Sequence, residues 1–281
     1  MDIQNQTKTK TLHGLRHIAL LEDEDIALDE GALMISAVAY PDVDVEFWQR
    51  EIDSLSELAA SRVAKERDPI SGLCALLEFM YGLWGLSGNR EDFYDARNSY
   101  LNQVLERRKG IPISMATLLI EVGRRTGLEL QGVGFPAHFL VKLSDVNELY
   151  VDPFSGRLID LEGCRRLLRK VSGGKIAFSG HLLKPTSNRS LLRRTLTNLK
   201  GVYIQKGNFD KAIRTTEAIM MIEPSAVNEI RDRGILHLYK KSYYRAAKDF
   251  EFYISLDPPD LDFIHMHNLM AEARRGMQGR N

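Results

Sequence analysis

The segment Gly207-Asn208-Phe209-Asp210-Lys211-Ala212 has an equivalent 34 residues further along the chain, Lys241-Ser242-Tyr243-Tyr244-Arg245-Ala246. Pro224 and Pro258 are separated by the same interval. A fixed period with a small residue inside each unit and a proline at its end is typical of stacked helical hairpins, because the small residue lets two helices approach closely. The last part of the chain, residues 186–281, is therefore expected to be an all-α repeat region.

This pattern resembles the tetratricopeptide (TPR) repeat, whose units are pairs of antiparallel helices. A final helix near 261–275 is expected to cap the stack. The four repeat helices are expected at 193–206, 209–222, 227–240 and 243–256. Helical-repeat arrays present concave surfaces that bind other chains, so a protein or peptide partner is expected in a TPR groove.

The region ahead of the repeats is expected to begin with helices. Apolar residues recur there at three-to-four spacing, and acidic residues stand in the first turns, as in amphipathic helices. The expected helices are 26–40, 44–63 and 69–85, followed by 98–108, which Gly110 closes. Residues 1–21 carry scattered Lys, Arg and His and are expected to form a flexible tail.

The sequence pattern changes between Gly110 and Gly156. Pro112 suits the first turn of a helix that runs to about Thr126, and Gly127 suits the C-terminal cap of that helix. Period-two alternation follows in three short segments, which are expected to be strands, at 131–135, 138–143 and 148–151. A helix followed by antiparallel hairpins makes residues 110–160 the core of an α+β domain.

Three residues of this core are candidates for a catalytic site. Ser114 lies in the first turn of the expected helix, where unpaired N–H groups and the helix dipole stabilise an anion. His138 and Asp152 have the same parity, and a three-residue turn at 144–146 would place them opposite each other with Cβ atoms about 5 Å apart. Asp152 would then orient the imidazole toward Ser114. Each residue also has a purely structural explanation: a helix cap, a packed histidine and a turn starter.

Three longer motifs carry more information than this spacing. They are Asn98-Ser99-Tyr100-Leu101-Asn102-Gln103-Val104-Leu105-Glu106-Arg107-Arg108-Lys109-Gly110-Ile111-Pro112-Ile113-Ser114, Gly132-Val133-Gly134-Phe135-Pro136-Ala137-His138-Phe139 and Tyr150-Val151-Asp152-Pro153-Phe154-Ser155-Gly156. Together they resemble the SirB-type bacterial family, whose members join a transglutaminase-like domain to C-terminal TPR repeats. The resemblance covers residues 22–275, nearly the whole chain.

The resemblance implies a transglutaminase-like (papain-like) α+β domain at 22–185, with a helical part at 22–109. Active members of that group carry a Cys at a helix N-terminus and then a His and an Asp on adjacent strands, an order matched by Ser114, His138 and Asp152. Ser replaces Cys here, and a hydroxyl needs more assistance from a base than a thiol does. The replacement argues against transglutaminase or cysteine-protease activity. The family's association with regulation of invasion genes allows an indirect regulatory role.

A second set of polar residues precedes Ser114. Asn98, Asn102 and Glu106 recur at a spacing of four and are expected on one helix face. Beside the helix of Ser114, Asn98 or Asn102 would face the cleft as a donor, and Arg107 or Arg108 would bind a carboxylate. The alternative is an exposed polar stripe without a binding role.

The charges of the chain balance overall but not locally. The 281 residues include 38 basic and 38 acidic side chains, which argues against a dedicated polyanion binder. Residues 22–57, however, hold twelve acids and one base, and residues 164–200 hold ten bases and no acid. One explanation is two solvated faces that attract each other within the fold. The other is a basic docking surface for an acidic partner or RNA, although no nucleic-acid motif accompanies it.

Composition excludes several classes of protein. Two cysteines cannot build a disulfide framework, and we find neither a signal peptide nor the roughly 20 apolar residues of a membrane span. A cytoplasmic location without membrane contact is expected, and nothing indicates a metal or an organic cofactor. These observations favour a protein-interaction or regulatory protein built on a degenerate transglutaminase-like domain, whose cleft is expected to bind a peptide or acidic segment beside the TPR groove. The alternative is a Ser-His-Asp hydrolase or acyl-transfer enzyme that acts on a peptide or amide bond.

Overall fold

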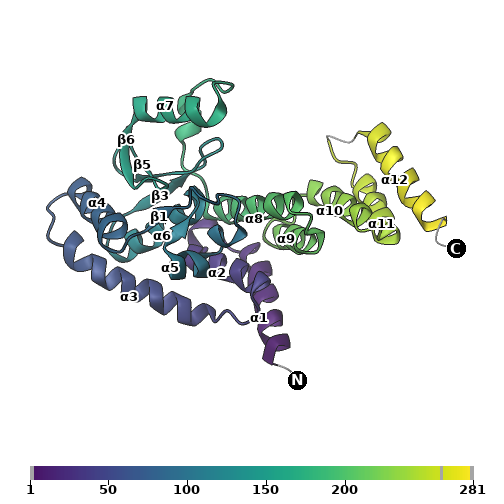
Figure 1. The fold of residues 1–281 in the computed structure, drawn as a ribbon, viewed down its shortest axis with the longest axis horizontal. Coiled ribbons are helices and arrows are strands. Elements are labelled where there is room, and N and C mark those ends of the chain that lie inside the picture. Colours follow the sequence, from purple (N-terminus) through teal and green to yellow (C-terminus); the bar gives the residue numbers. More distant parts are fainter. Residues whose placement is uncertain (1–2, 260–261, 279–281) are drawn as a thin grey trace. The chain divides into compact units, whose positions relative to one another are not determined.

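The computed structural model of the protein describes residues 3–259 and 262–278, which divide into two compact units. The core unit consists of residues 21–195 together with 1–11, and the repeat unit of residues 196–281 together with 12–20. The expected α+β domain and all-α repeat region are both confirmed, and Figure 1 shows their elements. The division between the units falls inside a helix, ten residues after the boundary expected at 185–186.

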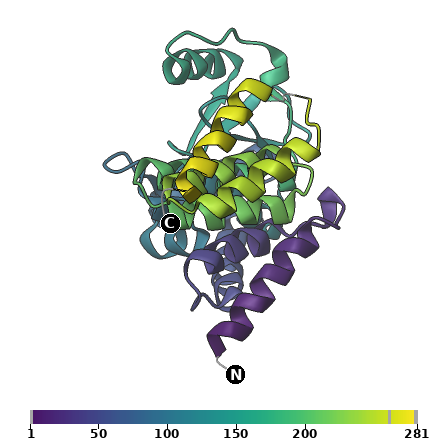
Figure 2. The same ribbon diagram turned by 90° about the vertical axis from the view of Figure 1, so that its right-hand side faces the viewer.

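The expected tail at 1–21 is replaced by a helix. Residues Ile3–Ile18 form α1, drawn in purple in Figures 1 and 2. Thr11, Leu15 and Ile18 are buried, at the i, i+4 and i+7 positions that share one face of a helix. The polar composition that indicated a tail conceals this short apolar stripe.

Three helices open the main part of the core unit, as the periodicity predicted. They are α2 (Leu28–Ala39), α3 (Val45–Val63) and α4 (Pro69–Leu77), and a π-helical turn at Glu78–Leu83 continues α4. Asp44 and Asp68 cap α3 and α4, because their carboxylates accept hydrogen bonds from backbone N–H groups of the first turns.

The next segment differs from the single helix expected at 98–108. A 3-10 turn covers Ala96–Asn98, α5 begins only at Leu101 and ends at Arg107, and Arg108 adopts a left-handed conformation with φ 53°. Directly after α5 and Arg108 comes the short strand β2 (Lys109–Gly110), which pairs in parallel with β1 (Ser87–Gly88). The capped turn at Asp95, whose carboxylate accepts from the Arg97 N–H, takes the place of the expected first helical turn.

Helix α6 (Pro112–Arg125) is the centre of the core unit. Every residue from Pro112 to Gly123 is buried. On one side α6 packs against α2 and α3, and on the other against the four-stranded antiparallel sheet, which follows chain order. The strands are β3 (Leu130–Val133), β4 (Leu140–Leu143), β5 (Leu149–Asp152) and β6 (Arg157–Asp160). Helix α6 therefore lies between the helical layer and the sheet.

Helix α7 (Leu161–Ser172) packs against β6, and neither element was expected from the sequence. Cys164 and Leu168 of α7 join a buried cluster with sheet and loop residues, namely Val133, Phe135, Leu140, Tyr150 and Leu183. Leu183 ends a 3-10 turn at Gly180–Leu183.

The repeat unit confirms the helices that the 34-residue period predicted. They are α8 (Asn188–Gln205), α9 (Phe209–Ile222), α10 (Asn228–Tyr239), α11 (Tyr243–Ser255) and α12 (Phe263–Gln278), in green to yellow in Figures 1 and 2. Ala212 and Ala246 are fully buried, as close helix packing requires. The capping helix was expected from residue 261, but residues 260–261 lie outside the described residues.

Candidate functional site

Ser114 uses its hydroxyl to hold the start of α6. Its Oγ accepts a hydrogen bond from Ile111 N at 3.2 Å and lies 2.5 Å from Asn98 O and 3.1 Å from Ile111 O. A hydroxyl has one proton to donate, and the shorter distance assigns that proton to Asn98 O. The side chain is buried, and a Cβ on Gly110 would come within 2.9 Å of the Oγ. The hydroxyl therefore joins β2 and the 3-10 turn to the first turn of α6.

His138 and Asp152 meet, although not by the predicted register. Val141 pairs with Val151, so Leu140 rather than His138 is the neighbour of Asp152 across the ladder. His138 lies in the turn before β4, where Ala137 has a φ of 51°. The predicted cross-strand pairing is wrong by two residues, because this turn delays the start of β4. From the turn, Nε2 of His138 still reaches Oδ1 of Asp152 at 2.7 Å.

The carboxylate of Asp152 is fixed by several donors. Its Oδ1 also accepts from Phe154 N at 3.0 Å, and its Oδ2 accepts from the Ser155 hydroxyl at 2.7 Å. Burial raises the pKa of Asp152, but the hydrogen bonds from His138 and Ser155 outweigh it and leave the pKa below its ordinary value. An ionised Asp152 accepts a hydrogen bond from the Nε2–H group of a neutral His138 imidazole. Nδ1 of His138 is then the ring nitrogen that can accept a proton.

Ser114 and His138 are connected through other residues rather than by a direct hydrogen bond. Within residues 3–259 and 262–278 no hydrogen bond joins the two side chains. Gly110, beside Ser114, pairs with Gly88 on the neighbouring strand. A Cβ on Gly88 would come within 2.5 Å of the Phe154 ring, whose centroid is 6.4 Å from that of His138. The histidine and aspartate form a pair, and the serine belongs to a separate hydrogen-bond group.

The side chain of Asn98 is buried and connects neighbouring segments of the chain through hydrogen bonds. Its Nδ2 donates to Asp92 O at 2.7 Å and to Phe93 O at 3.2 Å. Its Oδ1 accepts from Asn89 Nδ2 at 3.0 Å and from Arg107 Nη1 at 3.3 Å. Asn98 and Arg107, both expected to bind a ligand, thus bind each other and fix the loop that precedes α5.

The other expected binding residues do not share a face with Asn98, because α5 begins after it. Asn102 is buried, and its Oδ1 has no hydrogen-bond partner in the part of the chain that the structure describes. Glu106 is exposed and accepts from Gln103 Nε2 at 3.0 Å. The guanidinium of Arg108 lies over the Trp84 ring, 5.5 Å from its centroid. The expected stripe of Asn98, Asn102 and Glu106 is therefore absent.

Comparisons with known proteins agree with this architecture. The model of the Transglutaminase-like superfamily matches residues 46–197. The chain belongs to this superfamily. A tetratricopeptide repeat model matches residues 199–271. No solved structure matches the chain significantly.

Relatives extend over nearly the whole chain. A UPF0162 protein of Xylella fastidiosa is 37% identical over 257 residues, which cover 89% of this chain and 92% of the relative. A UPF0162 protein of Vibrio cholerae is 32% identical, covering 85% and 90%, respectively. Protein SirB1 of Salmonella typhimurium is 24% identical, covering 88% and 92%. The resemblance to the SirB-type family is confirmed.

Two further residues of the transglutaminase-like domain support the His138–Asp152 pair. Tyr81 donates its hydroxyl to Pro153 O at 2.6 Å, and burial raises its pKa. Arg194 donates to the carbonyls of Phe135 at 2.7 Å and His138 at 2.6 Å, and burial lowers its pKa. Sequence reasoning missed both, since contacts across so many residues leave no local signal.

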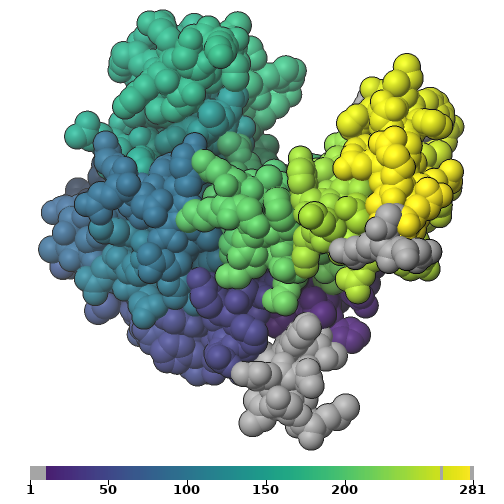
Figure 3. All heavy atoms as spheres, turned by 45° about the vertical axis from the view of Figure 1, so that its right-hand side comes forward, coloured from purple at the N-terminus to yellow at the C-terminus, as the bar shows by residue number. Residues whose placement is uncertain are grey.

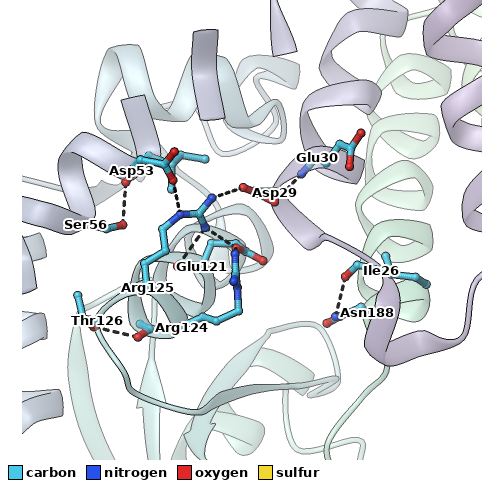
Figure 4. A network of polar contacts seen from close by, with 12 residues as sticks. Ile26, Asp29, Glu30, Asp53, Ser56, Glu121, Arg124, Arg125, Thr126 and Asn188 are labelled. Atoms are coloured by element: carbon cyan, nitrogen blue, oxygen red, sulfur yellow. Dashed lines mark hydrogen bonds and ion pairs between the residues drawn. The ribbon is translucent and has the colours of Figure 1, made fainter. Parts of the chain in front are cut away.

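A second polar network lies in the helical layer of the same domain (Figure 4). Arg125 of α6 binds Asp29 of α2 at 2.5 Å, Asp53 of α3 at 2.6 Å and Glu121 of α6 at 2.6 Å. Asp29 and Glu121 are buried. Burial alone would lower the pKa of Arg125, but the hydrogen bonds to Asp53 and Asp29 raise it. The network therefore ties three helices together around one permanent cation.

No group of three His, Cys, Asp or Glu side chains that could hold a metal ion occurs among the described residues. In the same part of the chain, no helix combines the length and apolar character needed to cross a bilayer.

Proposed function

We propose that this protein is a cytoplasmic interaction or regulatory protein whose transglutaminase-like domain has lost acyl-transfer chemistry. The observation that carries the proposal is the engagement of Ser114. Its hydroxyl donates to a backbone carbonyl and accepts from a backbone N–H, as a helix-capping residue does. A nucleophilic serine instead donates to the base that removes its proton.

The repeat unit supplies the interacting surface in this proposal. TPR arrays bind other proteins and have no chemistry of their own. Large apolar side chains on the repeat unit are exposed, among them Tyr244 at 62% and Phe252 at 54%. Both cysteines are free thiols, and Cys164 is buried, which suits a reducing compartment.

Two labelling reactions test the loss of chemistry. A fluorophosphonate probe is expected to leave Ser114 unmodified in the wild type, with chymotrypsin as the positive control. In a Ser114→Cys variant, iodoacetamide is expected to modify Cys74, which is exposed, faster than the new buried thiol. Stoichiometric fluorophosphonate labelling of Ser114 that is lost in Ser114→Ala and in His138→Ala would contradict the proposal.

Site-specific photocrosslinking in living bacteria tests the interaction. A benzoylphenylalanine at Phe252 is expected to give a discrete protein adduct, whereas the same residue at Leu58, which is 63% exposed on α3, is expected to give none. Equal adduct patterns at the two positions, or no adduct at either Tyr244 or Phe252, would contradict a repeat-mediated interaction.

The alternative function is a Ser-His-Asp hydrolase or acyl transferase for peptide or amide bonds. One observation favours it: His138 and Asp152 form the 2.7 Å pair that a general base needs. Catalysis would require the Ser114 hydroxyl to leave Asn98 O and turn toward His138. The fluorophosphonate experiment separates the two functions, because only the enzyme reacts at Ser114.

A further inference from the structure

Helix α7 presents a solvent face made of basic side chains. Its inner face is buried through Gly163, Cys164 and Leu168. The residues of its outer face are all exposed, and four of them are basic: Arg165, Arg166, Arg169 and Lys170. They form two rows along the helix, because residues four apart in a helix lie one above the other. Figure 1 shows α7 beside β6, and Figure 3 shows this teal segment at the molecular surface.

The charge of this face is largely unneutralised. Glu162 is the one acid of α7, and it lies 3.9 Å from both Arg165 and Arg166, at the outer limit of an ion pair. Among the described residues, Arg169 and Lys170 have no ion pair. The exposed Lys175 follows α7, and residues 164–200 contain no acid. The acidic segment 22–57 could attract the basic segment 164–200 within the fold, but the basic side chains of α7 take no part in such an attraction.

The face is also firmly held. Asp160 caps α7 by accepting from Gly163 N at 2.7 Å, and Gly173 ends the helix in a left-handed conformation with φ 61°. Leu168 is 1% exposed and Cys164 is fully buried. The basic side chains therefore project from a fixed scaffold, and a ligand does not have to order the backbone to use them.

We propose that the outer face of α7 binds the phosphate backbone of a nucleic acid without reading its sequence. Protein partners usually bury an apolar centre from which charged residues are depleted, and the outer face of α7 has only charged side chains. Phe178 is covered by Arg165, whose guanidinium lies 4.5 Å from the ring centroid. Nucleic-acid interfaces are, in contrast, strongly positive and polar. Three arginines suit phosphate, because a guanidinium can donate to two of its oxygens at once.

Fluorescence anisotropy with a labelled 20-nucleotide single-stranded RNA of mixed sequence tests the proposal on the full chain. The test variant is Arg169→Gln/Lys170→Gln. The matched control is Arg274→Gln/Arg275→Gln, which removes two adjacent exposed bases from another helix, α12. Both variants lower the net charge by two, so a difference between them reports the location of the charge. Circular dichroism melting verifies that both remain folded.

The wild type and the α12 variant are expected to bind the RNA in 50 mM KCl with similar affinity. The α7 variant is expected to bind at least about tenfold more weakly, and the slope of log K against log salt to fall by about 1.4, because two phosphates are no longer neutralised. The absence of wild-type binding, or equal weakening in the two variants, would overturn the proposal. Competition by poly-glutamate or by phosphatidylglycerol vesicles as effective as unlabelled RNA at equal charge would also overturn it, in favour of an acidic protein or a membrane surface.

Discussion

At the scale of single residues, Arg125 joins three helices of the core unit through its ion pairs. It neutralises two buried carboxylates, Asp29 and Glu121, and also binds Asp53. Removing the cation while the carboxylates stay buried is far more costly than the absence of the hydrogen bonds alone, because an unpaired buried charge has no solvent to stabilise it. Arg125→Leu is therefore expected to lower the free energy of unfolding by about 3–5 kcal/mol in urea titrations at pH 7.

Arg124→Leu is the control for this prediction. Arg124 binds the same Glu121 at 3.0 Å, but its side chain is 63% exposed. Exposed ion pairs contribute little, so a loss below about 1 kcal/mol is expected. Equal losses in the two variants would show that burial of the carboxylates does not decide the energy of the network.

Asp152 makes the stability of the core unit depend on pH. Its folded pKa lies below the unfolded value of about 3.9, since the hydrogen bonds of His138 and Ser155 favour the ionised form. Its contribution is thus present above about pH 4 and is lost as the pH falls through the folded pKa. Asp152→Asn is expected to reduce the free energy of unfolding by about 1–3 kcal/mol at pH 7 and by less at pH 3.

Urea titrations at pH 7, 5 and 3 measure this dependence. Asp145→Asn, which changes an exposed carboxylate in the turn between β4 and β5, is expected to have no comparable effect. A difference between Asp152→Asn and the wild type that stays constant down to pH 3 would show that the carboxylate gains nothing from its charge.

The sequence brought His138 and Asp152 together through their strand parity and their match to the family motifs, and the two side chains lie in contact. Their predicted register was wrong, because the left-handed turn at Ala137 has no distinctive residue such as Gly or Asn. Arg125 and Arg194 bind partners far away in the sequence, and single-chain patterns do not reveal such pairs.

At the scale of elements, two glycines in the repeat helices are expected to behave oppositely. A Cβ on Gly234 of α10 would come within 2.4 Å of the Phe250 ring, which is fully buried, whereas a Cβ on Gly201 of α8 would meet nothing within 4 Å. Gly234→Ala is expected to cost about 1–3 kcal/mol through overpacking. Gly201→Ala is expected to gain up to about 1 kcal/mol, because alanine favours the helix.

Thermal and urea unfolding of the two variants measures this difference. A Gly234→Ala variant as stable as Gly201→Ala would mean that α10 and α11 can separate without cost. That result would contradict the close approach of these helices at Gly234.

The elements themselves were predictable to different degrees. The repeat helices followed from one period, because each unit repeats the same packing. Strand β6 and helix α7 escaped prediction, since a four-residue strand after Gly156 shows too little alternation and the basic residues of α7 obscured its apolar positions. Helix α5 was extended too far toward the N-terminus, because the sequence does not distinguish a 3-10 turn from the first turn of an α-helix.

At the scale of the whole molecule, the core unit should include the first half of α8. Asn188 and Arg189 donate backbone N–H groups to Asp23 at 2.8 and 3.0 Å, and Arg194 holds the carbonyls of Phe135 and His138. Leu191 and Leu192 of this segment are at most 1% exposed. These contacts all lie within the core unit, although the residues belong to a helix that continues into the repeats.

The prediction compares two truncated chains, 21–197 and 21–187. The longer fragment, which ends with the matched superfamily region, is expected to melt cooperatively. The shorter one is expected to be strongly destabilised or unfolded, because it lacks two fully packed leucines, at about 2–5 kcal/mol each, and the Arg194 hydrogen bonds. Circular dichroism melting and one-dimensional proton NMR distinguish these outcomes. Within the longer fragment, Arg194→Met is expected to shift the His138 ring resonances, since Arg194 donates to the His138 carbonyl. Equal stability of the two fragments would instead place the boundary before α8, and the first turns of that helix would then belong to the repeats.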